Sequence, residues 1–178
     1  MDFNPKTNVT TLVDDASSWI PTSAIASNVK GVYHQDGIFL CSRYGACKHF
    51  PIGHDEWIDV PSLNATERYL PAMAVVGGKV LVTGGRMGTI TLKTTELFDG
   101  ESWTYGPDMP EGRFSHAVVA YTAMEILMYS GYSKPSNTVV LGNMATVYTY
   151  DFSDPNSGWV QKTDMPQKAH GVTVGHLR

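Results

Sequence analysis

One motif, centred on a tryptophan, recurs three times along this 178-residue chain and accounts for most of its sequence. The fullest copy spans residues 97–119 and contains an apolar run, an Asp-Gly turn, a tryptophan, a proline-rich segment and an arginine. The tryptophans are Trp57, Trp103 and Trp159, and the sixth residue after each is apolar (Leu63, Met109 and Met165). A repeat of this kind restricts the chain to folds built from successive similar units.

Each unit is expected to hold four short β-strands. The apolar runs are short, rich in Val, Ile, Tyr, Phe and Thr, and end at turn residues, which is typical of strands. Trp57 and Trp103 lie 46 residues apart, and Trp103 and Trp159 lie 56 residues apart. Four strands repeated at this interval predict the blades of a β-propeller, because stacking the blades radially covers both faces of each sheet.

The predicted fold is therefore all-β, with about three four-stranded antiparallel blades and partial ends. Residues 1–28 are interpreted as the end of a preceding blade and an irregular connection, and residues 29–178 as a propeller segment. The blades are placed at about 29–60, 70–105 and 115–162, and the first strand of a further blade at 170–175. We expect an incomplete propeller, either a truncated product or a fragment of a larger ring. Its open edge predicts self-association.

The motif resembles the kelch repeat. The second unit carries Gly84-Gly85, Glu96-Leu97-Phe98-Asp99, Trp103, Pro107-Asp108-Met109-Pro110, Arg113 and His116. The third keeps Gly131, Tyr150-Asp151, Trp159 and Met165-Pro166, with Ser130 for the first glycine and Lys168 or Ala169 where arginine is expected. The first keeps Trp57 and Arg68 but has Ser42-Arg43 in place of the double glycine. The resemblance covers roughly residues 30–178 and implies a propeller that binds other proteins through loops on one face.

Several residues of the motif have predicted structural roles. The pair Gly84 and Gly85 permits a turn with positive φ. Trp103, like Trp57 and Trp159, is expected to fill the gap between neighbouring blades. Arg113, like Arg68, can donate several hydrogen bonds to open carbonyl groups where the chain crosses between blades. His116 is expected to have a structural role in the same crossing.

Charge and hydropathy exclude two classes of partner. The chain has 13 basic and 17 acidic residues, a net charge of −4 and no basic cluster, so we expect no nucleic-acid partner. The longest nearly apolar run, residues 117–129, is interrupted and is shorter than the roughly 20 residues that a membrane-spanning helix needs. The scattered carboxylates are interpreted as a solvated surface.

Catalysis is the main alternative to a binding module. The six histidines share no ligand-type spacing, so no metal site or cofactor is expected; they are His34, His49, His54, His116, His170 and His176. Copper radical oxidases of the galactose oxidase type share the kelch fold but need a cysteine cross-linked to a tyrosine. Tyr44 is too close along the chain to Cys41 and Cys47 to supply that pair. No catalytic residue is assigned, and we expect no enzyme.

The two cysteines bear on the cellular compartment. Aligning the repeats places Cys41 with Thr83 on a second strand and Cys47 with Thr95 on a third strand. Opposed residues of antiparallel strands approach to about 4.5 Å, at the short end of disulfide geometry. The pair can therefore form a disulfide, as in the secreted kelch-like proteins that it resembles, or remain reduced in a cytosolic blade. Glycosylation sequons at Asn8 and Asn64 also slightly favour an extracellular location.

The predicted binding surface lies on the loops that join second to third strands. The Gly85–Lys93 and Tyr132–Asn143 loops should emerge on one face, beside the corresponding loop of the first unit. The candidate binding residues form a cationic and aromatic rim and are Arg43, Tyr44, Arg86, Met87, Tyr132 and Lys134. The expected partner is a protein of unknown identity. Two alternatives remain: ordinary solvated hairpin tips, or the propeller of an intracellular BTB-kelch adaptor.

Overall fold

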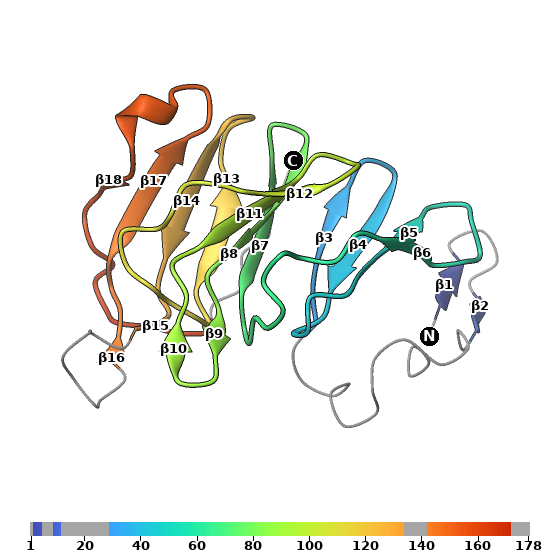
Figure 1. Ribbon diagram of the computed structural model, residues 1–178, viewed down its shortest axis with the longest axis horizontal. Helices are drawn as coiled ribbons and strands as arrows, with labels where there is room; N and C mark the ends of the chain where they lie inside the picture. Colours follow the sequence, from blue (N-terminus) through green and yellow to red (C-terminus); the bar gives the residue numbers. More distant parts are fainter. Residues whose placement is uncertain (1, 5–8, 12–28, 134–141, 172–178) are drawn as a thin grey trace.

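Three four-stranded antiparallel sheets dominate the computed structural model, which describes residues 2–4, 9–11, 29–133 and 142–171 (Figure 1). The first sheet contains β3 (Lys30–His34), β4 (Gly37–Cys41), β5 (Cys47–Pro51) and β6 (Ile58–Val60). The second contains β7 (Ala72–Val76), β8 (Lys79–Thr83), β11 (Thr95–Phe98) and β12 (Trp103–Tyr105). The third contains β13 (Ala117–Ala120), β14 (Glu125–Tyr129), β17 (Val147–Asp151) and β18 (Val160–Gln161).

The remaining elements are short. Two-stranded sheets pair β1 (Asp2–Asn4) with β2 (Val9–Thr11), β9 (Arg86–Met87) with β10 (Ile90–Thr91), and β15 (Tyr132–Ser133) with β16 (Gly142–Asn143). A 3₁₀ turn, η2 (Pro155–Ser157), precedes β18. None of the described residues forms a helix long and apolar enough to cross a membrane. The predicted all-β class with four-stranded antiparallel sheets is confirmed.

Within each sheet the strands follow one another in sequence order. The repeat alignment also gives the correct register, because Cys41 pairs with Cys47 in the first sheet and Thr83 pairs with Thr95 in the second. The repeat tryptophans differ in their position relative to the fourth strand of each sheet. Trp103 opens β12, but β6 begins one residue after Trp57 and β18 begins one residue after Trp159.

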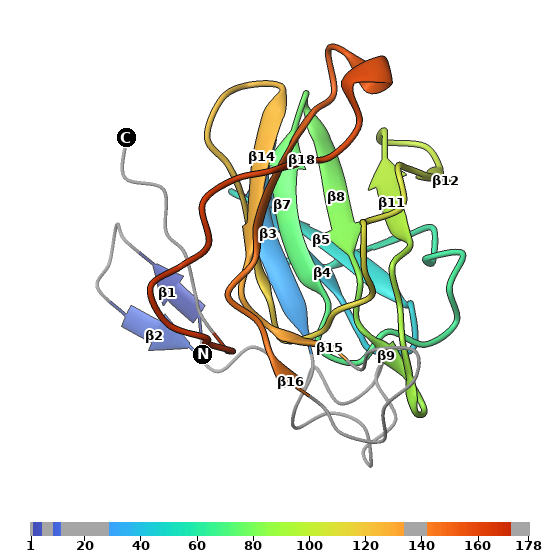
Figure 2. The ribbon, with the colours of Figure 1, turned by 90° about the vertical axis from the view of Figure 1, so that its left-hand side faces the viewer.

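Two apolar clusters hold the three sheets together. The first lies between the first and second sheets and centres on Phe39, Val80, Phe98 and Trp103. The second lies between the second and third sheets and centres on Leu81, Val118, Ile126 and Tyr150. Successive sheets therefore pack face to face, with the first strands β3, β7 and β13 side by side (Figure 1). Figure 2 shows β3 next to β7 from a second direction. Burying these faces is the main stabilising contribution to the fold.

The antiparallel order brings two kinds of connection to one end of the sheets. Each second strand runs toward this end, and the link to the third strand turns there. Each fourth strand also runs toward it, and the crossing to the next sheet begins there. The expected loops at Gly85–Lys93 and Tyr132–Asn143 contain the short strand pairs β9–β10 and β15–β16, which lie at the bottom of Figure 1. We call this end the hairpin face.

Candidate functional site

A continuous row of arginine and aromatic side chains runs across the hairpin face. It joins the three connections between second and third strands to the three crossings. In spatial order its members are Tyr44, Arg43, Tyr69, Arg86, Phe114, Tyr132 and His170. We call these seven residues the aromatic–arginine row. Four of the six predicted binding residues belong to it, Met87 adjoins it in the sequence, and Lys134 lies outside the described residues.

One end of the row is formed by Arg43 and its neighbours. The guanidinium carbon of Arg43 lies 4.7 Å from the centroid of the Tyr44 ring and 5.5 Å from that of Tyr69. A guanidinium Nη of Arg43 also donates to a carboxylate oxygen of Glu67 at 2.6 Å. This hydrogen bond raises the pKa of Arg43 above its usual value. The positive charge of Arg43 is thus already paired.

Arg86 occupies the middle of the row. Its guanidinium carbon lies 5.1 Å from the ring centroid of Tyr69 and 5.1 Å from that of Phe114. These two aromatic residues come from successive crossings, so Arg86 links one crossing to the next. Cation–π contacts of this kind contribute about 0.5–1 kcal/mol each at exposed sites.

The other end of the row is aromatic. The Phe114 and Tyr132 rings are stacked with their centroids 5.4 Å apart. The Tyr132 hydroxyl lies 2.9 Å from Nε2 of His170, and the two ring centroids are 4.2 Å apart. His170 is exposed, whereas Phe114 is buried. The aromatic–arginine row is therefore buried near its middle, at Phe114, and exposed at both ends, at Tyr44 and His170.

Backbone pairing fixes the spacing of the row. Tyr69 and Arg86 exchange two backbone hydrogen bonds of 2.9 Å. Phe114 and Tyr132 exchange equivalent bonds of 3.0 and 2.9 Å. In each case the residue after a buried crossing arginine pairs with the residue after the double-glycine position. That position is Gly84-Gly85 in the second unit and Ser130-Gly131 in the third. The glycine at that position has φ of 99° in Gly85, a conformation that other residues rarely adopt.

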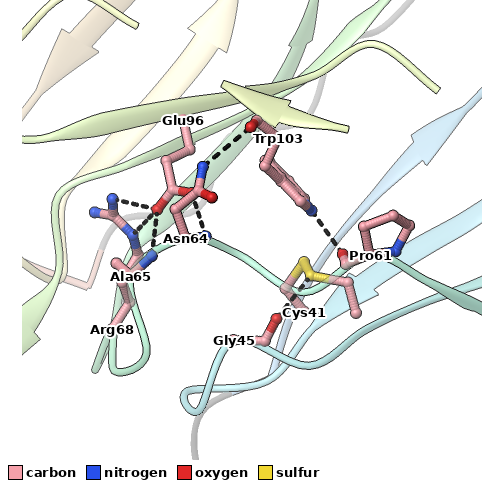
Figure 3. The surroundings of a disulfide bond; sticks show 9 residues. Cys41, Gly45, Pro61, Asn64, Ala65, Arg68, Glu96 and Trp103 are labelled. Carbon is pink, nitrogen blue, oxygen red and sulfur yellow. Dashed lines mark hydrogen bonds and ion pairs between the residues drawn. A yellow bond between two sulfur atoms is a disulfide. The ribbon is translucent and has the colours of Figure 1, made fainter. Parts of the chain in front are cut away.

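A buried ion pair anchors the first crossing beneath the row (Figure 3). Arg68 donates to the Glu96 carboxylate through Nε at 3.2 Å and through an Nη at 2.8 Å, and neither side chain is exposed. The backbone N–H groups of Asn64 and Ala65 donate to the same carboxylate at 2.6 and 3.1 Å. The interpretation of the carboxylates as a solvated surface is therefore wrong for Glu96. Four donors compensate the loss of hydration that burial imposes on it.

Arg113 has the corresponding position in the second crossing but a different set of partners. Like Arg68, it donates to backbone carbonyls of the following sheet, here those of Ser130 and Thr146 at 3.2 and 3.4 Å. Its carboxylate partner is Glu111, at 2.7 Å, and its guanidinium lies over the Tyr148 ring. Burial lowers the pKa of Arg113, and the charge of Glu111 opposes that shift.

His116 is enclosed between the second and third sheets. Its Nε2 lies 2.8 Å from the Thr83 hydroxyl, and the residue is buried. Burial, with a smaller contribution from the charge of Arg113, lowers the pKa of His116 to about 3. The imidazole is therefore neutral at physiological pH and unsuited to acid–base exchange with solvent.

The three repeat tryptophans each contact an aromatic residue of the neighbouring third strand. Their ring centroids lie 5.1 Å apart for Phe50 and Trp57, 5.2 Å for Phe98 and Trp103, and 5.2 Å for Tyr150 and Trp159. Trp103 adds a hydrogen bond from its indole N–H to the backbone carbonyl of Pro61 at 2.7 Å, which joins two sheets (Figure 3).

A disulfide closes the loop that carries Arg43 and Tyr44. It joins Cys41 and Cys47 at the ends of β4 and β5. Of the two sequon asparagines, Asn8 lies outside the described residues. The side-chain amide of Asn64 donates to the Trp103 carbonyl at 3.0 Å, so this asparagine contributes to the contact between sheets.

No group of three or more His, Cys, Asp or Glu side chains with metal-binding geometry occurs among the described residues. A groove of about 1320 Å³ runs along the first strands and is lined mainly by small apolar residues and glycines. It lies apart from the hairpin connections that carry the aromatic–arginine row.

Sequence reasoning missed Tyr69, Phe114, Glu67 and His170, all of which lie in crossings. A signal for two of them exists, because Tyr69 and Phe114 directly follow the repeat arginines Arg68 and Arg113. An aromatic residue at the same repeat position in successive crossings indicates a shared surface.

Repeated four-stranded antiparallel sheets, packed face to face and crosslinked by buried crossing arginines, define a blade-type repeat protein of the all-β class. Residues 67–110, which run from the end of the first crossing through the second sheet, match the family model of the Kelch motif. The matched motif and the repeated sheets together fit a kelch-repeat protein. A search of curated proteins finds no match to the chain.

Proposed function

We propose that this chain is a non-enzymatic interaction module that binds a partner protein through its hairpin face. The aromatic–arginine row is the observation that carries the proposal. Arginine and tyrosine are enriched among the residues that dominate binding energy at protein interfaces. In the row such residues, linked through the buried Phe114 ring, extend across all three sheets.

The order of the row also favours binding. Association costs free energy when flexible side chains must be immobilised, by about 0.5–1.5 kcal/mol for each side chain. The ring contacts and the Arg43–Glu67 ion pair hold the side chains of the row before any partner arrives. Tyr44, Met87 and Ile90 are exposed beside them and add apolar area that a partner could cover.

The disulfide supports an extracellular location for this module. Disulfides persist in oxidising compartments and are rare in the cytosol. Cys41 and Cys47 are both buried, and their bond closes the loop that presents Arg43 and Tyr44. The BTB-kelch alternative would place the same loop in a reducing compartment.

Charge reversal on the hairpin face tests the proposal. A variant with Arg43→Glu, Arg86→Glu and Lys134→Glu is compared with the wild-type chain in capture of partners from extracellular fluid. Lys79→Glu, an exposed reversal at the opposite end of the second sheet, is the control. We expect the triple variant to lose its partners and the control to keep them. Undiminished capture by a folded triple variant would contradict the proposal.

The copper oxidase alternative has its own test. Metal analysis and an oxidase assay of the purified protein should give neither stoichiometric copper nor turnover. Stoichiometric copper or oxidase turnover would contradict the proposed binding module and favour an enzyme.

A further inference from the structure

We infer that the Arg86 guanidinium is the anchor for a carboxylate side chain, Asp or Glu, of the protein that binds the hairpin face. The inference rests on the proposed function and names the chemical group that the face recognises.

The first step is the charge state of the row. Four arginines lie in the described part of the chain, and three of them form ion pairs: Arg43 with Glu67, Arg68 with Glu96 and Arg113 with Glu111. Arg86 appears in none of the ion pairs formed among the described residues. Its charge is therefore the one arginine charge in this part of the chain that remains to be balanced.

The second step is the direction in which Arg86 can donate. The guanidinium carbon lies over the rings of Tyr69 and Phe114, 5.1 Å from each centroid, and both contacts leave the N–H groups of Arg86 without a carboxylate acceptor among the described residues. The N–H bonds of a guanidinium lie in its plane and point outward from its edges. An edge that faces solvent matches a planar acceptor with two oxygen atoms, which is the geometry of a carboxylate.

The third step separates a carboxylate from a phosphate. A phosphorylated side chain carries nearly two negative charges and is usually held by a cluster of arginines. The nearest arginine along the row, Arg43, is already paired with Glu67 at 2.6 Å. A single available positive charge is matched by the single negative charge of Asp or Glu.

The neighbours of Arg86 add an apolar requirement. Met87 and Ile90 are both exposed and pair with each other across the hairpin β9–β10. Because Met87 directly follows Arg86, a partner carboxylate bound to Arg86 would lie beside Met87 and Ile90. An apolar side chain next to that carboxylate could pack against these two residues. The expected partner segment therefore has an acidic residue next to an apolar residue.

The test uses peptides as the probe. Random 12-residue peptides displayed on phage are selected on the disulfide-intact wild-type protein. The binding of a selected peptide is then measured by calorimetry, together with versions in which each acidic residue is replaced by its amide or by phosphoserine. The protein variants are Arg86→Gln, Arg86→Lys and, as the control that removes an exposed cation at the opposite end of the second sheet, Lys79→Gln.

We expect one acidic position of the peptide to be essential. Its replacement by the amide should weaken binding about tenfold or more, and Arg86→Gln should cause the same loss. The two changes together should cost little more than either alone, because they remove one shared contact. Arg86→Lys should also lose binding, since an ammonium group cannot form the two-pronged contact. Lys79→Gln should change affinity less than about threefold, because its charge is distant from the hairpin face and is screened by salt.

The possible failures are distinct. Peptides that depend on the hairpin face but tolerate the amide or Arg86→Gln would overturn the inference and leave the proposed function standing. Tighter binding of the phosphoserine version than of any acidic version would also overturn it. Peptides unaffected by the triple charge reversal, or no selected peptide at all, would contradict the proposed function itself.

Discussion

The guanidinium of Arg68 lies 2.8 Å from the carboxylate of Glu96, and both side chains are withdrawn from solvent. The pair joins the crossing that leaves the first sheet to the third strand of the second sheet. It therefore fixes the segment that continues into Tyr69, a member of the aromatic–arginine row. This contact and the related contacts of Arg113 therefore fix the two crossings that form part of the hairpin face.

Removing the charge of Glu96 should be strongly destabilising. Glu96→Gln leaves Arg68 buried without its ionic partner, and breaking one side of a buried ion pair costs about 3–5 kcal/mol. We expect a loss of about 3 kcal/mol in the free energy of unfolding, measured by denaturant titration. Glu101→Gln, in an exposed turn, is the control and should change stability by less than about 0.5 kcal/mol. A loss under about 1 kcal/mol for Glu96→Gln would show that the ion pair does not anchor the crossing.

Trp103 should be the most sensitive apolar position between the first two sheets. It is buried against Phe39 and Phe98 and donates to the Pro61 carbonyl. Trp103→Ala is expected to cost about 3–5 kcal/mol, measured by thermal or denaturant unfolding. The exposed Tyr105 of the same strand offers a comparison, because Tyr105→Ala removes a ring that packs against little. Equal effects of the two changes would contradict the assigned packing.

The disulfide should stabilise the first sheet modestly. A pair of threonines is a suitable replacement for the two cysteines, because Thr83 and Thr95 of the second sheet occupy the positions of Cys41 and Cys47. The double variant Cys41→Thr, Cys47→Thr should fold and lose on the order of 2 kcal/mol, as expected for opening so short a loop. A reducing agent should then lower the melting temperature of the wild-type chain but leave that of the variant unchanged. Unchanged stability in the variant would contradict this contribution.

His116 should make the fold sensitive to mild acid. Its pKa is lowered to about 3 in the folded protein and returns to about 6.5 on unfolding. Protonation therefore favours the unfolded chain, so this contribution is complete above pH 6.5 and is lost as the pH falls from 6.5 toward 3. Between pH 7 and pH 5 the loss should be about 2 kcal/mol.

The variant His116→Gln isolates that contribution. Its absolute stability is expected to be lower, because the contact with Thr83 changes, but its stability should fall less steeply between pH 7 and pH 5. The same slope in His116→Gln as in the wild-type chain would contradict the buried neutral imidazole.

The sequence was informative where structure depends on local pattern. Short apolar runs, rich in Val, Ile, Tyr, Phe and Thr and bounded by turn residues, predicted the four-stranded sheets. The repeat alignment placed Cys41 on a second strand and Cys47 on the third strand beside it, and in the structure these residues are opposed, as are their equivalents Thr83 and Thr95. Both inferences depend on residues close together in the chain.

The missed features depend on contacts between distant segments. Glu96 was taken for a surface carboxylate because the residue type is usually exposed, and only the approach of residues 64–68 makes its burial possible. The predicted set of binding residues likewise lacked Tyr69 and Phe114. These residues contact Arg86 although they are 17 and 28 positions away from it in the sequence. The strands β9 and β10 have two residues each, which is too few to show an alternating apolar pattern in the sequence.

The most direct test of the account places a photo-crosslinking amino acid at four exposed apolar positions. Tyr44 and Ile90, 46% and 58% exposed, lie on the hairpin face, whereas Tyr121 and Ile52, 45% and 64% exposed, lie in turns at the opposite end of the sheets. Because exposure is matched between the two ends, differences in crosslinking report where the partner binds. The account predicts crosslinks to the partner from Tyr44 and Ile90 and none from Tyr121 and Ile52. Crosslinks from Tyr121 and Ile52 alone would place the binding surface at the other end and contradict the central claim.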